Sequence, residues 1–117
     1  MQNNRFSIAV LGAGNIGSAV LTRLQELDDK VLKLDLKKVL VSDTSKDRGV
    51  SKDLLTDNFD DILNDDSIDL VIEVLGGVDP GKEYIKSLLQ KGKAVITANK
   101  DIIADCGQEL ITLAEEN

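Results

Sequence analysis

The feature that most constrains this chain is a glycine motif, G-x-G-x-x-G at Gly12–Gly17, which follows a predicted strand and opens a predicted helix. The strand prediction rests on the apolar run over residues 6–11, which only Ser7 interrupts. Such a run is typical of a strand buried on both faces of a parallel sheet. From Ile16 to about Leu27, apolar residues recur at helical spacing, which gives the expected helix one apolar face. The motif therefore lies where a dinucleotide-binding junction requires it.

Each glycine of the motif has a separate physical role in this interpretation. Gly12 allows a tight turn out of the strand, Gly14 lets a pyrophosphate approach the backbone, and Gly17 lets the helix pack close to the sheet. The unpaired N–H groups of the first helical turn and the helix dipole favour an anion there. Glycines also serve ordinary turns, so it is the flanking strand and helix that favour nucleotide binding over a structural turn.

Composition excludes several classes of function. The 117 residues suit one domain with its own core, and the net charge of −7 argues against a nucleic-acid or anionic-membrane partner. The charge does not argue against a phosphate-bearing cofactor, because backbone amides supply much of the field that binds phosphate. No apolar run approaches the ~20 residues of a membrane span, and the first six residues do not form a signal peptide.

The chain contains no histidine and a single cysteine, Cys106. A histidine-based metal site or a serine–histidine triad is therefore impossible within it, and we expect no metal centre. Any proton transfer must use lysine, tyrosine, cysteine or a carboxylate. One cysteine excludes an internal disulfide and fits a reducing cytoplasm. With no cation or histidine nearby in sequence, Cys106 is interpreted as a small packing residue.

After the first helix, strand-like and helix-like segments alternate. Residues 30–38 are ambiguous and are interpreted as a connector, and Asp57 or Asn58 is expected to cap a brief helix. Asp79 and Pro80 are expected as the N-cap and first helical position of the next helix. The expected elements are a strand over 36–42, a loop over 44–53, a strand over 54–56, helix 59–63, turn 64–67, strand 68–75, a helix ending at Gly92, strand 93–97, a turn at 102–103, a break at Gly107 and helix 108–115. This alternation predicts an α/β fold, a Rossmann-like doubly wound parallel sheet.

Ligands of such sheets bind beyond the carboxyl ends of the strands. Four sequence motifs fall at these ends, so we expect one crevice to gather them. They are Gly12–Gly17, Asp43–Arg48, Gly76–Gly77 and Thr97–Lys100.

The second motif bears on the choice of nucleotide. An acidic residue such as Asp43 at the end of the second strand commonly binds the adenosine ribose, which favours NAD. Lys46 and Arg48 follow in the loop, and a cation there can hold a 2′-phosphate, which favours NADP. A solvated, charged turn is the alternative, about equally weighted for Lys46. Dissociation constants for NAD and NADP in the wild type and in Arg48→Ala distinguish these interpretations.

Three further positions have two interpretations each. Glu73 lies inside an apolar strand, and we slightly favour a partly exposed residue paired with a lysine over one facing the cofactor crevice. Gly76 and Gly77 either let a cofactor approach the backbone or only make a turn. Lys100 either orients a carbonyl group and assists proton transfer or is a surface charge, and the residues alone favour the surface charge.

Three stretches together resemble one family. They are LGAGNIGSAV at 11–20, VIEVLGGVDP at 71–80 and KAVITANKDIIADCGQEL at 93–110. The chain resembles the N-terminal nucleotide-binding domain of homoserine dehydrogenase over nearly its whole length. The loop VLVSDTSKDRG at 39–49 is similar to bacterial members.

The resemblance implies NAD(P)-dependent interconversion of aspartate semialdehyde and homoserine, in the cytoplasm, on the route to threonine, methionine and isoleucine. It implies Lys100 as a catalytic candidate and Arg48 as the phosphate ligand in members that use NADP, which we slightly favour over NAD. The implied pyrophosphate cradle is Gly12, Ala13, Gly14, Asn15, Ile16 and Gly17, and the implied nicotinamide end is Gly76, Gly77, Thr97 and Lys100.

Family members continue for a few hundred residues into a substrate and dimerisation domain. We therefore expect residues 1–117 to be a cofactor-binding fragment of a homodimeric enzyme that does not turn over a small-molecule substrate by itself. Two alternatives are the nucleotide-binding domain of another two-domain dehydrogenase and a non-catalytic nucleotide-sensing domain.

Overall fold

In the part of the chain that the structure describes, five strands form an all-parallel sheet in the order β3-β2-β1-β4-β5. The computed structural model describes residues 5–12, 14, 19, 33–46, 50–97 and 99–117. The helix predicted from Asn15 to Leu27 lies outside the described residues, except for Ala19. The predicted Rossmann-like α/β fold is confirmed. The elements are β1 (Arg5–Leu11), β2 (Lys33–Leu40), η1 (Lys52–Leu54), β3 (Leu55–Thr56), α2 (Asp60–Leu63), β4 (Leu70–Glu73), α3 (Gly81–Gln90), β5 (Ala94–Thr97) and α4 (Lys100–Glu116).

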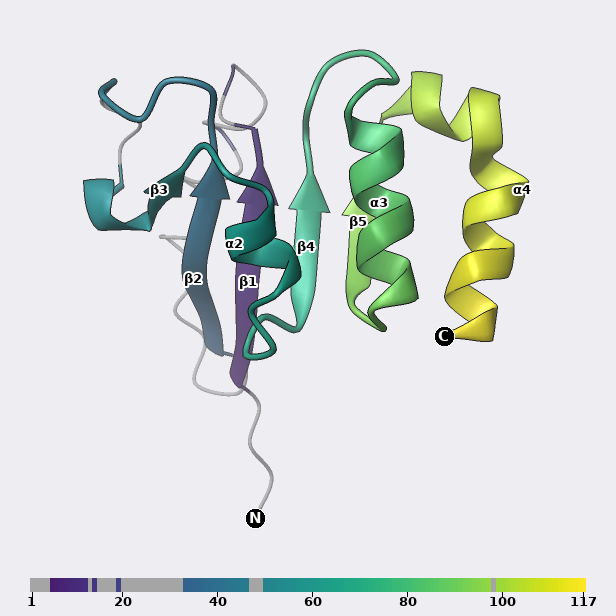
Figure 1. Cartoon of the computed structure of the whole chain (residues 1–117), viewed down its shortest axis with the longest axis horizontal. Coiled ribbons are helices and arrows are strands. Elements are labelled where there is room, and N and C mark those ends of the chain that lie inside the picture. The colour runs from purple at the N-terminus through teal and green to yellow at the C-terminus, as the bar shows by residue number, and fades with distance from the viewer. Residues whose placement is uncertain (1–4, 13, 15–18, 20–32, 47–49, 98) are drawn as a thin grey trace.

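The strand before the glycine motif is the centre of the sheet. β1 pairs with β2 on one side and β4 on the other, and residues 8–11 are almost completely buried. Because side chains alternate along a strand, Ala9 and Leu11 join a core cluster with Ile62 of α2 and Leu88 of α3. Val10 belongs to a second cluster. Figure 1 shows α2 and α3 lying in front of the sheet. The apolar run of β1 is therefore an inner strand of the sheet, and the glycine motif begins at its carboxyl end.

The second strand differs from its prediction. It spans Lys33–Leu40 instead of 36–42, so part of the predicted connector is strand. The pairing with β1 shifts register after Ile8, where Leu36 and then Lys38 are successive partners. A bulge breaks the period of two, and Leu36 packs with Val39 and Val41 in one cluster. The regular alternation by which a strand is identified is therefore missing from this segment.

Helix starts also differ from their predictions. In α3, Pro80 is the N-cap position and Gly81 the first helical residue, and no side-chain cap is present. The Lys82 amide is already bonded to the Val78 carbonyl at 2.8 Å, so Asp79 is not used as a cap. At α2 the N-cap position is Phe59, although the Asn58 side chain accepts a 3.0 Å hydrogen bond from the Asp60 amide.

The last helix packs against α3. Ile85 and Leu89 meet Ile102 and Leu110 in a third core cluster. Two helical segments join at a kink at Cys106, where φ is −149° and ψ is 24°, one residue before the predicted break at Gly107. The short turn predicted at 102–103 is instead part of a helix that begins at Lys100. Among the residues that the structure describes, no helix has the length and apolar character needed to cross a membrane.

Candidate functional site

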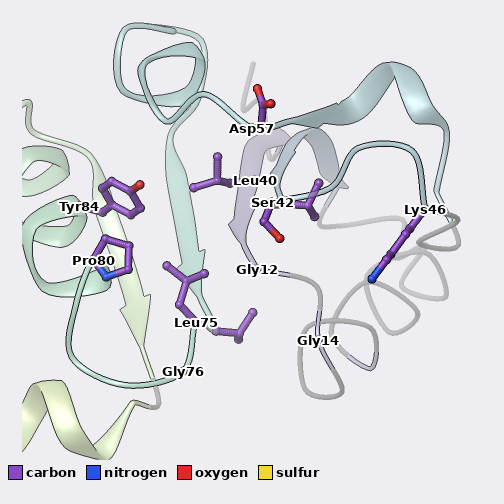
Figure 2. Close-up of a pocket in the computed structure, with 12 residues that line it drawn as sticks. Gly12, Gly14, Leu40, Ser42, Lys46, Asp57, Leu75, Gly76, Pro80 and Tyr84 are labelled. Atoms are coloured by element: carbon purple, nitrogen blue, oxygen red, sulfur yellow. The ribbon is translucent and has the colours of Figure 1, made fainter.

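A cavity of about 600 Å³ opens at the carboxyl edge of the sheet. This volume falls in the range of small-molecule sites, roughly 300–1,000 Å³. Figure 2 shows Pro80 and Tyr84 on one side of the cavity and Lys46 on the other, with Leu40 and Leu75 between them. The described lining residues are Gly12, Gly14, Leu40, Val41, Ser42, Lys46, Asp57, Val74, Leu75, Gly76, Pro80 and Tyr84.

The glycines that line the cavity differ in what surrounds them. Gly12 has φ +101°, and a Cβ built on it would lie 3.2 Å from the Val74 carbonyl oxygen. Its amide donates to the Leu40 carbonyl at 2.9 Å, which ties the turn to β2. In contrast, a Cβ on Gly14 or Gly76 would meet nothing within 4 Å. Gly12 therefore forms the turn, whereas Gly14 and Gly76 leave open space that a ligand can enter.

The loop after β2 brings a cation to the cavity. Lys46 lines it together with Ser42. Asp43, the predicted ribose ligand, is not among the described lining residues, and its Oδ1 accepts bonds from the Ser45 amide at 2.9 Å and the Ser45 hydroxyl at 2.6 Å. Five predicted site residues lie outside the described part of the chain, namely Ala13, Asn15, Ile16, Gly17 and Arg48.

Asp57, Pro80 and Tyr84 are among the lining residues that were not predicted as site residues. Asp57 follows β3, and its position after a strand would have identified it, but it was interpreted only as a helix cap. Tyr84, interpreted as part of the apolar face of α3, stacks on Phe59 with ring centroids 4.0 Å apart. Together with Pro80 it supplies one apolar wall of the cavity. No sequence signal distinguishes this role of Tyr84 from ordinary core packing.

The structure contradicts the interpretation of Glu73 favoured from the sequence, a partly exposed residue paired with a lysine. It is only 1% exposed. The carboxylate accepts hydrogen bonds from the Leu75 amide at 2.8 Å and the Thr97 hydroxyl at 2.5 Å. These bonds offset the cost of burying a carboxylate. Glu73 therefore joins the segments that follow β4 and β5.

The fourth predicted motif lies beside the cavity without lining its described part. The Thr97 hydroxyl donates to Glu73 and accepts from the Asn99 amide at 3.0 Å. Lys100 is exposed and is the first residue of α4. Gly77, at φ +71°, offers its carbonyl to the Asn99 side chain at 2.7 Å. Three of the four predicted motifs thus contribute residues to one cavity: Gly12 and Gly14, Lys46, and Gly76. The fourth is connected to the cavity lining by the hydrogen bond from Asn99 to the Leu75 carbonyl.

The side chains described next, whose pKa values are shifted, lie away from this cavity. Burial raises the pKa of the Cys106 thiol, which is consistent with its interpretation as a packing residue. On the surface, the Lys86–Glu109 ion pair between α3 and α4, at 2.7 Å, lowers the pKa of Glu109 and raises that of Lys86. None of these three residues lines the described cavity. Cys106 packs between α3 and α4, and the ion pair joins the same two helices.

Comparisons with known proteins agree on one family. Residues 12–117 match the family described as "Homoserine dehydrogenase, NAD binding domain". Homoserine dehydrogenase of Bacillus subtilis (strain 168) is 41% identical over an alignment of 117 positions, which covers 94% of this chain and 27% of that protein.

Solved structures give the same result. A crystal structure of S. aureus homoserine dehydrogenase at pH 8.5 superposes with a TM-score of 0.88 at 38% identity, covering 98% of this chain and 31% of that one. A hyperthermophilic archaeal homoserine dehydrogenase in complex with NADPH shares the fold, with a TM-score of 0.77 at 21% identity, over 97% of this chain and 41% of the other. The chain thus spans about a quarter to a third of the length of these two bacterial proteins.

Proposed function

This chain belongs to the homoserine dehydrogenase NAD-binding domain family, and from that premise we propose that its cavity binds NAD(P). The observation that carries the proposal is the open space over two glycines that line one cavity, Gly14 in the segment after β1 and Gly76 in the segment after β4. A backbone without Cβ atoms at these positions lets a pyrophosphate and a ribose approach closely. When bound, the nicotinamide ring supplies hydride transfer.

The residue roles in this proposal follow the order of the strands. The motif after β1 cradles the pyrophosphate, the loop after β2 holds the adenosine ribose, and the segments after β4 and β5 face the nicotinamide. Lys100 is the catalytic candidate at that end. The set predicted from the sequence is Gly12, Ala13, Gly14, Asn15, Ile16, Gly17, Asp43, Arg48, Gly76, Gly77, Thr97 and Lys100, and we add Lys46 because it lines the cavity.

We favour NADP over NAD on the position of one side chain. Lys46 lines the cavity on the side of the β2 loop, where the adenosine ribose belongs in this fold. A lysine ammonium there adds a point charge that a 2′-phosphate can pair with and a 2′-hydroxyl cannot. Asp43, which would favour NAD, directs Oδ1 to Ser45 within its own loop.

For the whole protein we propose NAD(P)-dependent interconversion of aspartate semialdehyde and homoserine, a cytoplasmic step towards threonine, methionine and isoleucine. The match to the Bacillus subtilis relative covers 94% of this chain and 27% of that protein. We therefore assign cofactor binding to residues 1–117, and substrate binding and dimerisation to the part of the relatives that these residues do not match.

A ligand titration tests the proposal. A ligand that binds only the folded state raises the thermal unfolding midpoint, and at 100 times its dissociation constant it adds about 2.7 kcal/mol of stability. We expect both dinucleotides to raise the midpoint of the 117-residue chain, NADP at the lower concentration. Purified 1–117 should show no homoserine oxidation. Absence of any shift at millimolar dinucleotide contradicts the binding site, and turnover contradicts the assignment of substrate binding elsewhere.

A further inference from the structure

The buried carboxylate of Glu73 lies at the junction of two loops near the proposed cofactor site. Its donors come from the segment after β4, from the last residue of β5 and from the segment after β5. They are the Leu75 amide at 2.8 Å, the Thr97 hydroxyl at 2.5 Å and the Asn99 side-chain amide at 3.4 Å. Such a group is held by these bonds, because an unpaired buried carboxylate is strongly unfavourable. The two segments are therefore fixed to each other through one side chain.

Asn99 makes a second connection between the same segments. Its Nδ2 donates to the Leu75 carbonyl at 3.0 Å and to the Gly77 carbonyl at 2.7 Å. Its Oδ1 accepts from the amides of Asp101 and Ile102, at 3.1 and 3.2 Å. One half of the side chain caps α4 and the other half holds the loop after β4.

These bonds have a geometric consequence for Lys100. Asn99 directly precedes it, and the cap sets the start and direction of α4. The same side chain fixes the carbonyls on both sides of Gly76. The glycine loop and Lys100 are therefore held in one arrangement before any ligand binds.

We propose that Glu73 and Asn99 are positioning residues, which hold the Gly76–Gly77 loop and Lys100 together as a preformed wall for the nicotinamide end of the dinucleotide. This inference rests on the proposed function and goes beyond it, because neither side chain lines the described cavity. A site whose supporting bonds fix its geometry loses binding when those bonds are removed, even though the contacting groups remain.

The variant Asn99→Ser separates this role from simple helix capping. Serine is about as good an N-cap as asparagine, so the start of α4 is retained. Serine lacks the amide donors, so the bonds to Leu75 and Gly77 are lost. Glu73→Gln is a second variant. Its side chain has nearly the same shape as glutamate but has one acceptor oxygen in place of two. Asn64→Ser, at an exposed position that ends α2, is the matched control.

Calorimetric titration with two ligands tests the inference. NADP occupies the whole proposed site, and 2′-phospho-ADP-ribose lacks the nicotinamide. We expect the wild type to bind NADP more tightly than the fragment. We expect Asn99→Ser to weaken NADP about tenfold and the fragment less than about twofold. Glu73→Gln should act in the same direction and Asn64→Ser should change neither ligand.

The outcomes separate the two proposals, and affinity for the fragment also reports that each variant is folded. Equal weakening of both ligands in Asn99→Ser, or weakening of neither, overturns the positioning role and leaves the cofactor site intact. Equal wild-type affinity for NADP and the fragment overturns it as well. Failure of the wild type to bind either ligand removes the cofactor site itself and the inference with it.

Discussion

Glu73 and Thr97 are register partners on the neighbouring parallel strands β4 and β5, and the Thr97 hydroxyl donates a 2.5 Å hydrogen bond to the Glu73 carboxylate. The backbone ladder and the side chains therefore connect the same two positions. Since both strands end there, the loops that follow them start side by side. This relationship explains how an acidic residue is tolerated in an otherwise apolar strand.

Glu73→Ala should destabilise the fold by about 3 kcal/mol, because the Leu75 amide and the Thr97 hydroxyl lose their buried acceptor and a cavity is left. Glu73→Gln keeps the volume and one acceptor, so we expect a loss of about 1 kcal/mol. Urea denaturation gives both values. Glu115→Ala, exposed on α4, should stay within about 0.5 kcal/mol. An equally small effect of Glu73→Ala would contradict the network.

Alanine substitutions at Gly12 and Gly14 should separate stability from binding. Gly12 is at φ +101° with the Val74 oxygen 3.2 Å from a built Cβ, so Gly12→Ala should lower stability by about 2 kcal/mol. A Cβ added at Gly14 has no neighbour within 4 Å, so Gly14→Ala should leave the stability of the fold nearly unchanged. Its methyl group should nevertheless weaken dinucleotide binding at least about tenfold, because it occupies the space of the pyrophosphate. Thermal unfolding and calorimetric titration measure the two effects, and unchanged affinity in Gly14→Ala would place the pyrophosphate elsewhere.

Lys46→Ala should weaken NADP and spare NAD. Removing an ammonium that pairs with a 2′-phosphate at an exposed site corresponds to about 1 kcal/mol, or about fivefold in dissociation constant. Fluorescence titration with NADPH and NADH gives both constants, and the NADPH effect should shrink at high salt. Lys91→Ala, exposed after α3, is the charge-matched control. If both cofactors weaken equally, Lys46 does not select the phosphate.

The Cys106 thiol should be unreactive while the chain is folded. It is 7% exposed, and burial raises its pKa above the ordinary value of 9.0. At pH 8 we expect iodoacetamide to alkylate it at least about tenfold more slowly in buffer than in 8 M urea, because the thiolate is the nucleophile. Since the unfolded chain ionises first, the contribution of Cys106 to stability is complete below about pH 9 and decreases as the pH rises further. Similar alkylation rates in both solvents would show that the thiol is accessible.

Much of the fold could be predicted from local pattern. The apolar run before Gly12 identifies the central strand, and the alternation of segments gives the parallel sheet. The second strand was misplaced because a bulge near Lys37 breaks the alternation on which strand prediction depends. The start of α3 was misplaced because the Val78 carbonyl takes the amide that a side chain was expected to cap.

The sequence by itself determined the resemblance to the family, the alternation of strands and helices along the chain, and the glycine positions at the strand ends, because period and turn chemistry are local properties. Only the tertiary structure decided which of these ends share a cavity, that Tyr84 and Asp57 line it, and that Glu73 faces Thr97 and Asn99 and not a lysine. Those facts depend on the register and spacing of strands far apart in the chain, and no local pattern encodes them.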